Sequence, residues 1–202
     1  MKIRHCVSAA VLALFLAGCQ STVKSTPVET ADAPAAAQQY SRMLVIAGGA
    51  DQFLKEDSEE AIVAMLQKHG VTGTVGIRVI GPRTKFNRQV IEPYVASGKY
   101  DSLLFVRATL ADTGEVRPRE YGAYEATGNL DDYYDVAMLG YLAGHQVGGG
   151  DFNALATLFD VADRKAVWSE SYRISNPGNS DKMIGKITRN IEKGLRTAGY
   201  LK

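Results

Sequence analysis

The chain has 202 residues, of which 46% are hydrophobic and 22% are charged, close to the usage of an average globular protein. This composition excludes a wholly disordered or fibrous chain. The 23 Lys and Arg residues nearly balance the 22 Asp and Glu residues, which gives a formal net charge of +1. A chain with so little excess charge has no global electrostatic reason to bind nucleic acid.

The first 18 residues have the composition of a targeting segment. Lys2 and Arg4 form a basic start, and the apolar run 7–16 is too short to span a bilayer, which needs about 20 apolar residues. The run ends in Leu16-Ala17-Gly18-Cys19, which resembles the lipobox of bacterial lipoproteins. The alternative is an ordinary secretory signal peptide with an incidental cysteine.

The lipoprotein resemblance has several implications for the mature chain. Residues 1–18 are a signal peptide that is removed, and Cys19 carries diacylglycerol and an N-linked acyl chain such as palmitate. Residue Gln20, rather than Asp, implies sorting to the outer membrane by resemblance to enteric lipoproteins, with the domain facing the periplasm. Cys6 is lost with the signal, so the mature chain has one cysteine and no intrachain disulfide.

Residues 19–40 are expected to be the lipid anchor and a flexible tether. This segment is rich in Ala, Thr, Gln, Ser and Pro and has only scattered apolar residues. Such a composition buries too little apolar surface to offset the entropy of ordering the chain. A single domain is therefore predicted over residues 41–202.

The first half of this domain alternates between strand and helix patterns. A continuous apolar run at 43–47 predicts a buried strand, and Asp57 with Glu60 predicts the capped start of a helix that ends at about His69, before Gly70. The alternation of Val75, Ile77 and Val79 predicts a second strand. A short helix kinked at Pro93 and a buried strand at 103–106 follow.

The second half begins with residues 111–150, to which no firm structure is assigned, although 120–127 has some strand character. Residues 154–161 and 166–174 predict a β-hairpin. Ser180 then predicts the cap of a last helix, which has an apolar stripe and ends before Gly199. The predicted fold class is α/β, with a mixed β-sheet, helices packed on it, a β-α-β-α-β start, and a C-terminal hairpin and amphipathic helix.

The order of these elements resembles a family of periplasmic lipoproteins with a TolB-N-terminal-like domain. The segment LFDVADRKAVW at 158–168, from Asp160 to Trp168, carries most of the resemblance. The group includes the outer-membrane activator of penicillin-binding proteins and the curli secretion lipoprotein. It has no common catalytic site, and its known members hold or activate protein partners, so the resemblance implies a binding role.

Residues that could carry catalysis or bind a metal are few. The mature chain has His69 and His145 but no Cys or His at ligand spacing, and the acidic run at 131–135 lacks the spacing of a Ca²⁺ loop. There is no G-x-S-x-G motif. We therefore predict no catalytic residue, cofactor or metal. The alternative is a periplasmic hydrolase or small-ligand-binding protein with a pocket near His145.

Two groups of residues are candidates for contact with a partner. Five basic residues recur at steps of three or four along the last helix and so share one face: Lys182, Lys186, Arg189, Lys193 and Arg196. This face is either a solvated surface or a contact with anionic peptidoglycan, lipid headgroups or an acidic protein. Four tyrosines, which either pack in the core or form an interface, gather in the unassigned region: Tyr121, Tyr124, Tyr133 and Tyr134. These features predict a non-enzymatic outer-membrane lipoprotein that presents its domain to a periplasmic or outer-membrane protein in cell-envelope assembly or regulation.

Overall fold

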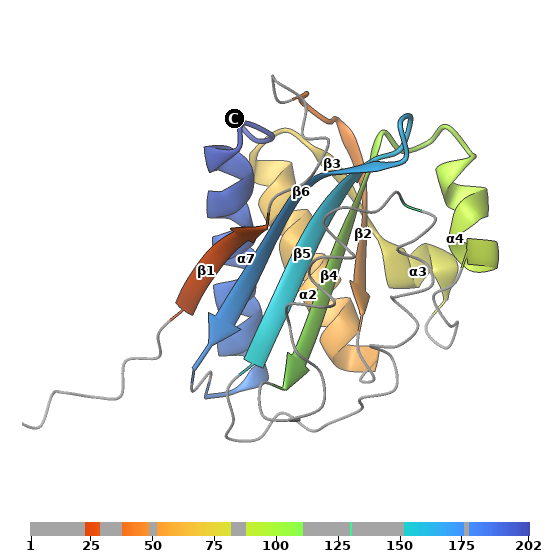
Figure 1. Ribbon diagram of the computed structural model, residues 1–202. Coiled ribbons are helices and arrows are strands. Elements are labelled where there is room, and N and C mark those ends of the chain that lie inside the picture. Colours follow the sequence, from red (N-terminus) through yellow and green to blue (C-terminus); the bar gives the residue numbers. More distant parts are fainter. Residues whose placement is uncertain are drawn as a thin grey trace, which may run out of the picture.

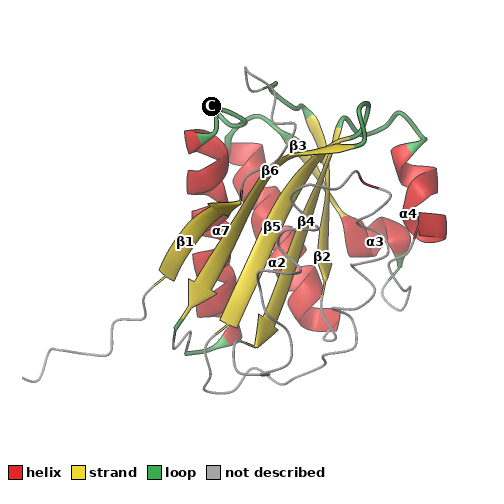
Figure 2. Cartoon of the chain, viewed as in Figure 1, coloured by secondary structure: helices red, strands yellow, loops and turns green. Residues whose placement is uncertain are grey.

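The computed structural model describes residues 23–28, 38–48, 52–81, 88–110, 130, 152–175 and 178–202. Within these ranges the chain forms a six-stranded mixed sheet with four helices packed on it (Figures 1 and 2). The α/β class, the hairpin and the C-terminal helix predicted from the sequence are confirmed.

The sheet has a parallel part and an antiparallel part. The strands are β1 (Val23–Val28), β2 (Arg42–Gly48), β3 (Thr72–Val75), β4 (Ser102–Leu110), β5 (Phe152–Asp160) and β6 (Lys165–Ile174). Their order across the sheet is β1-β6-β5-β4-β2-β3. Strands β3 and β4 pair with β2 in parallel, whereas β5 and β6 form a hairpin and β1 pairs antiparallel with β6. The apolar run of β2 is buried on both faces, because it lies in the parallel part beneath helices on each side.

The helices cover the two faces of the sheet unequally. They are α2 (Gln52–Lys68), α3 (Gly76–Ile80), α4 (Arg88–Val95) and α7 (Ser180–Thr197). Helices α2 and α7 contact each other and pack on one face, where Ile62 and Ile191 enter the larger core cluster. Helix α4 packs on the opposite face, where Ile91 contacts a second cluster formed with β2 and β4. Figure 1 shows α2 and α7 behind the sheet and α4 at its right-hand side.

Three local predictions differ from the structure. Helix α2 begins at Gln52, so Asp57 lies inside the helix and does not cap it. The alternating residues after Val75 form the short helix α3 rather than a strand. The last helix is capped by Asn179, whose side chain accepts a hydrogen bond from the backbone N–H of Lys182, and not by Ser180.

The predicted tether also contains an ordered strand. Residues 23–28 form β1, which pairs with β6 so that Val23 lies opposite Ile174 and Val28 opposite Ser169. The expectation of a flexible tether therefore does not hold for these six residues. Pro27 is tolerated because β1 is at the edge of the sheet.

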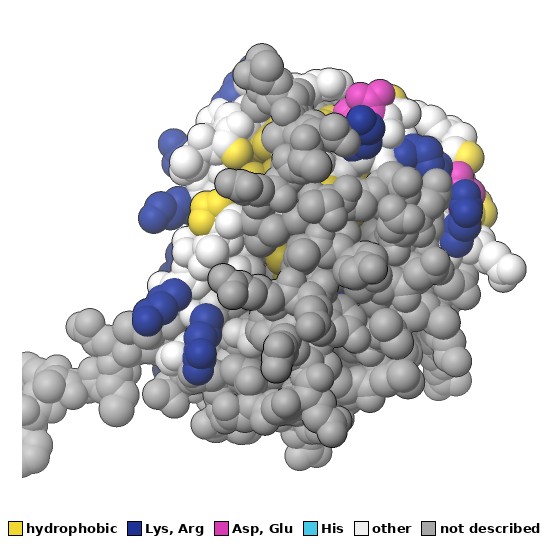
Figure 3. Space-filling view, viewed as in Figure 1, with side chains coloured by type: hydrophobic (Ala, Val, Ile, Leu, Met, Phe, Trp, Pro, Cys, Tyr) yellow, Lys and Arg dark blue, Asp and Glu magenta, His cyan; other side chains and the backbone are white. Residues whose placement is uncertain are grey.

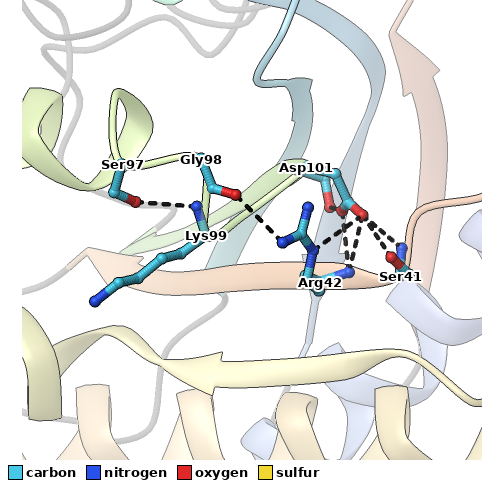
Figure 4. A network of polar contacts seen from close by, with 7 residues as sticks. Ser41, Arg42, Ser97, Gly98, Lys99 and Asp101 are labelled. Carbon is cyan, nitrogen blue, oxygen red and sulfur yellow. Dashed lines mark hydrogen bonds and ion pairs between the residues drawn. The ribbon is translucent and has the colours of Figure 1, made fainter.

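A polar network fixes the starts of β2 and β4 (Figure 4). The carboxylate of Asp101 accepts hydrogen bonds from the Ser41 hydroxyl at 2.7 Å and from the backbone N–H groups of Ser41 and Arg42, each at 3.0 Å. The Arg42 guanidinium donates to the Gly98 carbonyl at 3.2 Å. Since β2 and β4 are parallel neighbours, these bonds hold their first residues in register.

Replacing Asp101 by Ala should lower the free energy of unfolding at pH 7 by about 1–2 kcal/mol, because donors on Ser41 and Arg42 lose their acceptor. Burial alone would raise the pKa of Asp101, but the hydrogen bonds from Ser41 and Arg42 outweigh it and lower the pKa below its ordinary 3.8. The stabilisation is therefore present above the unfolded pKa and is lost as pH falls through the folded pKa. Urea denaturation from pH 7 downward tests this.

A suitable control is Asp57→Ala, since Asp57 is exposed on α2. It should leave the unfolding free energy nearly unchanged at each pH. A deficit of Asp101→Ala that stays constant as the carboxylate is protonated would contradict the role given to the charged form.

Candidate functional site

Helix α7 presents a basic face because its apolar face is fully used in packing. Its apolar residues are buried: Met183, Ile184, Ile187, Ile191 and Leu195. They lie at helical spacing against β5 and β6, so the polar side chains between them point away from the sheet. The sequence pattern of this helix is therefore realised as predicted, with the stripe of basic residues on the outer side.

The five basic residues of α7 form the clearest candidate surface in the described part of the chain. Lys186 is half-buried, and the other four are exposed: Lys182, Arg189, Lys193 and Arg196. Among the described residues, none of the five side chains forms an ion pair with a carboxylate. Of the two acids on α7, Asp181 lies in the first turn and Glu192 contacts His69 at 2.8 Å. We call these five residues the α7 basic face.

Strand β1 adds positive charge beside the start of α7. Lys24 on β1 lies directly opposite Arg173 on β6, and both side chains are exposed. Figure 3 shows Lys and Arg side chains gathered on the flank of the molecule formed by β1, β6 and α7, with no acidic side chain among them in that view.

The other predicted site residues lie outside the described residues. These are Cys19, the four tyrosines Tyr121, Tyr124, Tyr133 and Tyr134, and His145. Of the predicted site residues, the structure describes the five basic residues of α7, which share one face. The lipidation of Cys19, the tyrosine interface and the pocket near His145 stay predictions.

His69 has a structural role at the ends of two helices. Its Nδ1 lies 2.6 Å from the carbonyl oxygen of Lys202, and its Nε2 lies 2.8 Å from Oε1 of Glu192. The ring thus joins the end of α2 to α7 and to the last residue. Among the described residues, no group of three or more His, Cys, Asp or Glu side chains could hold a metal ion.

A buried carboxyl group that was not predicted from the sequence lies at the carboxyl ends of the parallel strands. Glu59 on α2 is 0% exposed and accepts hydrogen bonds from the backbone N–H groups of Ala47 at 2.8 Å and Ile77 at 2.7 Å. Val75, at the start of α3, makes no side-chain capping bond, so Glu59 supplies the missing acceptor from another helix. A signal was present, because Glu59 precedes the buried Ile62 by three residues and so shares its face of α2.

The electrostatics of Glu59 differ from those of an ordinary surface carboxylate. Burial raises its pKa from 4.5 to about 7, although the backbone hydrogen bonds from Ile77 and Ala47 and the nearby Lys55 act in the opposite direction. Burial also lowers the pKa of Lys55, which is 4% exposed and lies one turn before Glu59. The hydrogen bonds from Ala47 and Ile77 join α2 to β2 and α3, so Glu59 stabilises this end of the sheet.

The comparisons with known proteins yield distant structural neighbours. No protein-family model and no curated protein matches the chain. Two crystal structures of a PelC dodecamer from Paraburkholderia phytofirmans align with TM-scores of 0.44 and 0.40 at 14% and 17% identity, covering 87% of this chain and 96% of that one. Lipoprotein GNA1162 from Neisseria meningitidis aligns with a TM-score of 0.37 at 14% identity, covering 78% of this chain and 99% of its own. Alignments this distant assign neither a family nor a function.

None of the described helices is long and apolar enough to cross a membrane.

Proposed function

We propose that this protein is a non-enzymatic lipoprotein of the outer membrane whose α/β domain binds a periplasmic or outer-membrane protein in cell-envelope assembly or regulation. The anchor is Cys19, proposed from the sequence Leu16-Ala17-Gly18-Cys19 after a basic and apolar start. Two or three acyl chains, at about 0.8 kcal/mol per buried CH₂ group, hold a domain stably at a membrane without a spanning helix.

The observation that supports a binding role is the α7 basic face. Five positive side chains share one side of a helix and, among the described residues, none of them is neutralised by an ion pair. Such a surface attracts an acidic partner and raises the rate at which the two proteins meet. The matching partner therefore presents Asp or Glu side chains at the spacing of these basic residues, about 4.5–6 Å for each step of three or four residues along an α-helix.

Crosslinking in the periplasm of native cells, followed by capture of the lipoprotein, tests the proposal. The variant Lys193→Glu/Arg196→Glu should lose at least tenfold of one specific crosslinked protein, because opposite charges at the contact are replaced by like charges. The variant Tyr121→Ala/Tyr124→Ala/Tyr133→Ala/Tyr134→Ala tests the tyrosine interface in the same way. Cys19→Ser, which removes the acylated thiol, should move the protein from the membrane to the soluble fraction.

The matched control is Arg88→Glu/Lys99→Glu, which makes the same charge change at exposed positions on and just after α4, on the opposite face of the sheet from α7. Circular dichroism establishes that each variant is folded. A set of crosslinked proteins that is identical for the wild type, the α7 variant and the tyrosine variant would contradict the binding role.

A further inference from the structure

The place where the chain would meet the membrane follows from the position of β1. Strand β1 begins at Val23, four residues after Cys19. Four residues of fully extended chain span at most about 14 Å. An acylated Cys19 therefore holds the start of β1 close to the headgroups, and the domain cannot stand far from the bilayer as a tether of about 20 residues would allow.

Three elements meet at this end of the domain. Because β1 and β6 are antiparallel, the first residue of β1, Val23, lies opposite the last residue of β6, Ile174. Helix α7 begins six residues after Ile174 and runs back along β6. Figure 1 shows the start of β1, the end of β6 and the first turn of α7 at the same end of the molecule. We call this the anchor end.

The anchor end carries basic side chains on both sides of the sheet. Lys24 and Arg173 lie on the face opposite α7, since the neighbouring β6 residues Tyr172 and Ile174 face the helix. Lys182 and Lys186 lie in the first two turns of α7 on the other side. Within residues 23–28 and 178–186, the one described acid is Asp181 and the basic residues are Lys24, Lys182 and Lys186.

We propose that the anchor end docks on anionic lipid headgroups of the membrane that holds Cys19. This rests on the lipid anchor of the proposed function. Lys24, Lys182 and Lys186 belong to the segments at the end of the domain from which the chain leads back to Cys19, so the lipid anchor holds this end, with these three side chains, toward the membrane surface. An anionic phosphate layer is the surface of matching charge that is certain to be present there once the chain is acylated.

The same geometry separates two functions along α7. Arg196 lies about 21 Å beyond Lys182 along the helix, which is more than twice the screening length of about 8–10 Å at physiological salt. The distal residues Lys193 and Arg196 are therefore outside the field of the docked membrane. They point into the periplasm and are left for the protein partner, whereas the residues of the anchor end bind lipid.

The test uses the full acylated protein reconstituted in vesicles. Acylation consumes the Cys19 thiol, so an introduced cysteine is the only free thiol of the mature chain. A fluorophore is placed on Thr26→Cys, on exposed β1, or on Thr197→Cys, at the far end of α7. Quenching by headgroup-labelled lipid is compared in pure phosphatidylcholine and in phosphatidylcholine with phosphatidylglycerol.

The measured quantity is the ratio of quenching at the proximal label, Thr26→Cys, to quenching at the distal label, Thr197→Cys. If the anchor end docks, this ratio should be at least twofold higher in anionic vesicles than in neutral ones. High salt should remove the difference. Each basic residue near an anionic surface favours the docked state about fivefold, so Lys24→Glu/Lys182→Glu should shift the equilibrium by at least about 25-fold and abolish the effect. Lys193→Glu/Arg196→Glu, with the same charge change, should leave it intact.

The outcomes separate the anchor from the docking. Protein that does not stay on neutral vesicles would overturn the lipid anchor and the docking with it. Protein that stays on both kinds of vesicle with the same ratio of quenching would overturn the docking alone. An equal loss of the quenching difference in Lys24→Glu/Lys182→Glu and in Lys193→Glu/Arg196→Glu would also overturn the docking, because the effect of charge would then not depend on its position.

Discussion

The free energy of unfolding should fall by about 2–3 kcal/mol as the pH rises from 5 to 8, through the titration of Glu59. The Glu59 carboxyl group is 0% exposed beneath the carboxyl ends of β2 and β3. Burial raises its pKa from 4.5 to about 7, and neither the hydrogen bonds from Ile77 and Ala47 nor the charge of Lys55 offsets this. The domain should therefore be most stable on the acidic side of neutrality, as far as this group is concerned.

The sign follows from the two pKa values. In the unfolded chain Glu59 titrates near 4.5, whereas in the folded chain it titrates near 7. Between these values the folded state binds the proton more tightly, so protonation favours folding. The resulting stability is fully present below the unfolded pKa and is lost as pH rises through the folded pKa. Asp101, whose pKa is lowered, has the opposite dependence in a lower pH range.

The variant Glu59→Gln isolates this contribution, because glutamine does not titrate. The stability difference between wild type and variant should be larger at pH 5 than at pH 8 by about 2–3 kcal/mol, as measured by urea denaturation. Glu60→Gln is the matched control, since it removes one charge from the next residue, which is partly exposed and paired with Arg78. It should keep the wild-type pH dependence. A pH-independent difference for Glu59→Gln would contradict the raised pKa.

Regular hydrophobic patterns made most of the fold predictable. The apolar run of β2, the hairpin of β5 and β6, and the stripe on α7 each have a period that fits one kind of element, and each was placed correctly. The short helix α3 was mistaken for a strand because three alternating apolar residues do not distinguish the two. Its first turn donates a hydrogen bond to Glu59 of α2, which is 18 residues away from Ile77 and which local periodicity does not reveal.

Features that depend on distant partners were not predictable from local patterns. Strand β1 has the polar, Pro-containing composition of a tether and is ordered only because it pairs with β6, so that Val23 meets Ile174. For the same reason, only one part of the candidate site was predictable from the sequence. The basic face of α7 follows from helical spacing alone, whereas the placement of Lys24 beside Arg173 follows only from the register of two strands far apart in the sequence.

The packing of α7 on β6 depends on a glycine at one position. A side-chain carbon at Gly194 would clash with the carboxylate of Glu170 and would lie 2.7 Å from Cζ2 of Trp168. Both neighbours are buried in β6, at 8% and 9% exposed, so they have little room to move. Gly185, nine residues earlier on the same helix, has nothing within 4 Å of the corresponding position. The two glycines therefore have the same helical setting and opposite steric surroundings.

Gly194→Ala should lower the free energy of unfolding by about 1–3 kcal/mol, because the cost of overpacking exceeds what alanine gains in helix propensity. Gly185→Ala should instead raise it by about 0.5–1 kcal/mol, since only the propensity changes. Urea denaturation of both variants measures the difference. Trp168 is the one tryptophan of the chain, so its fluorescence should shift in Gly194→Ala and stay unchanged in Gly185→Ala. Equal stabilisation by both substitutions would mean that α7 does not approach β6 this closely.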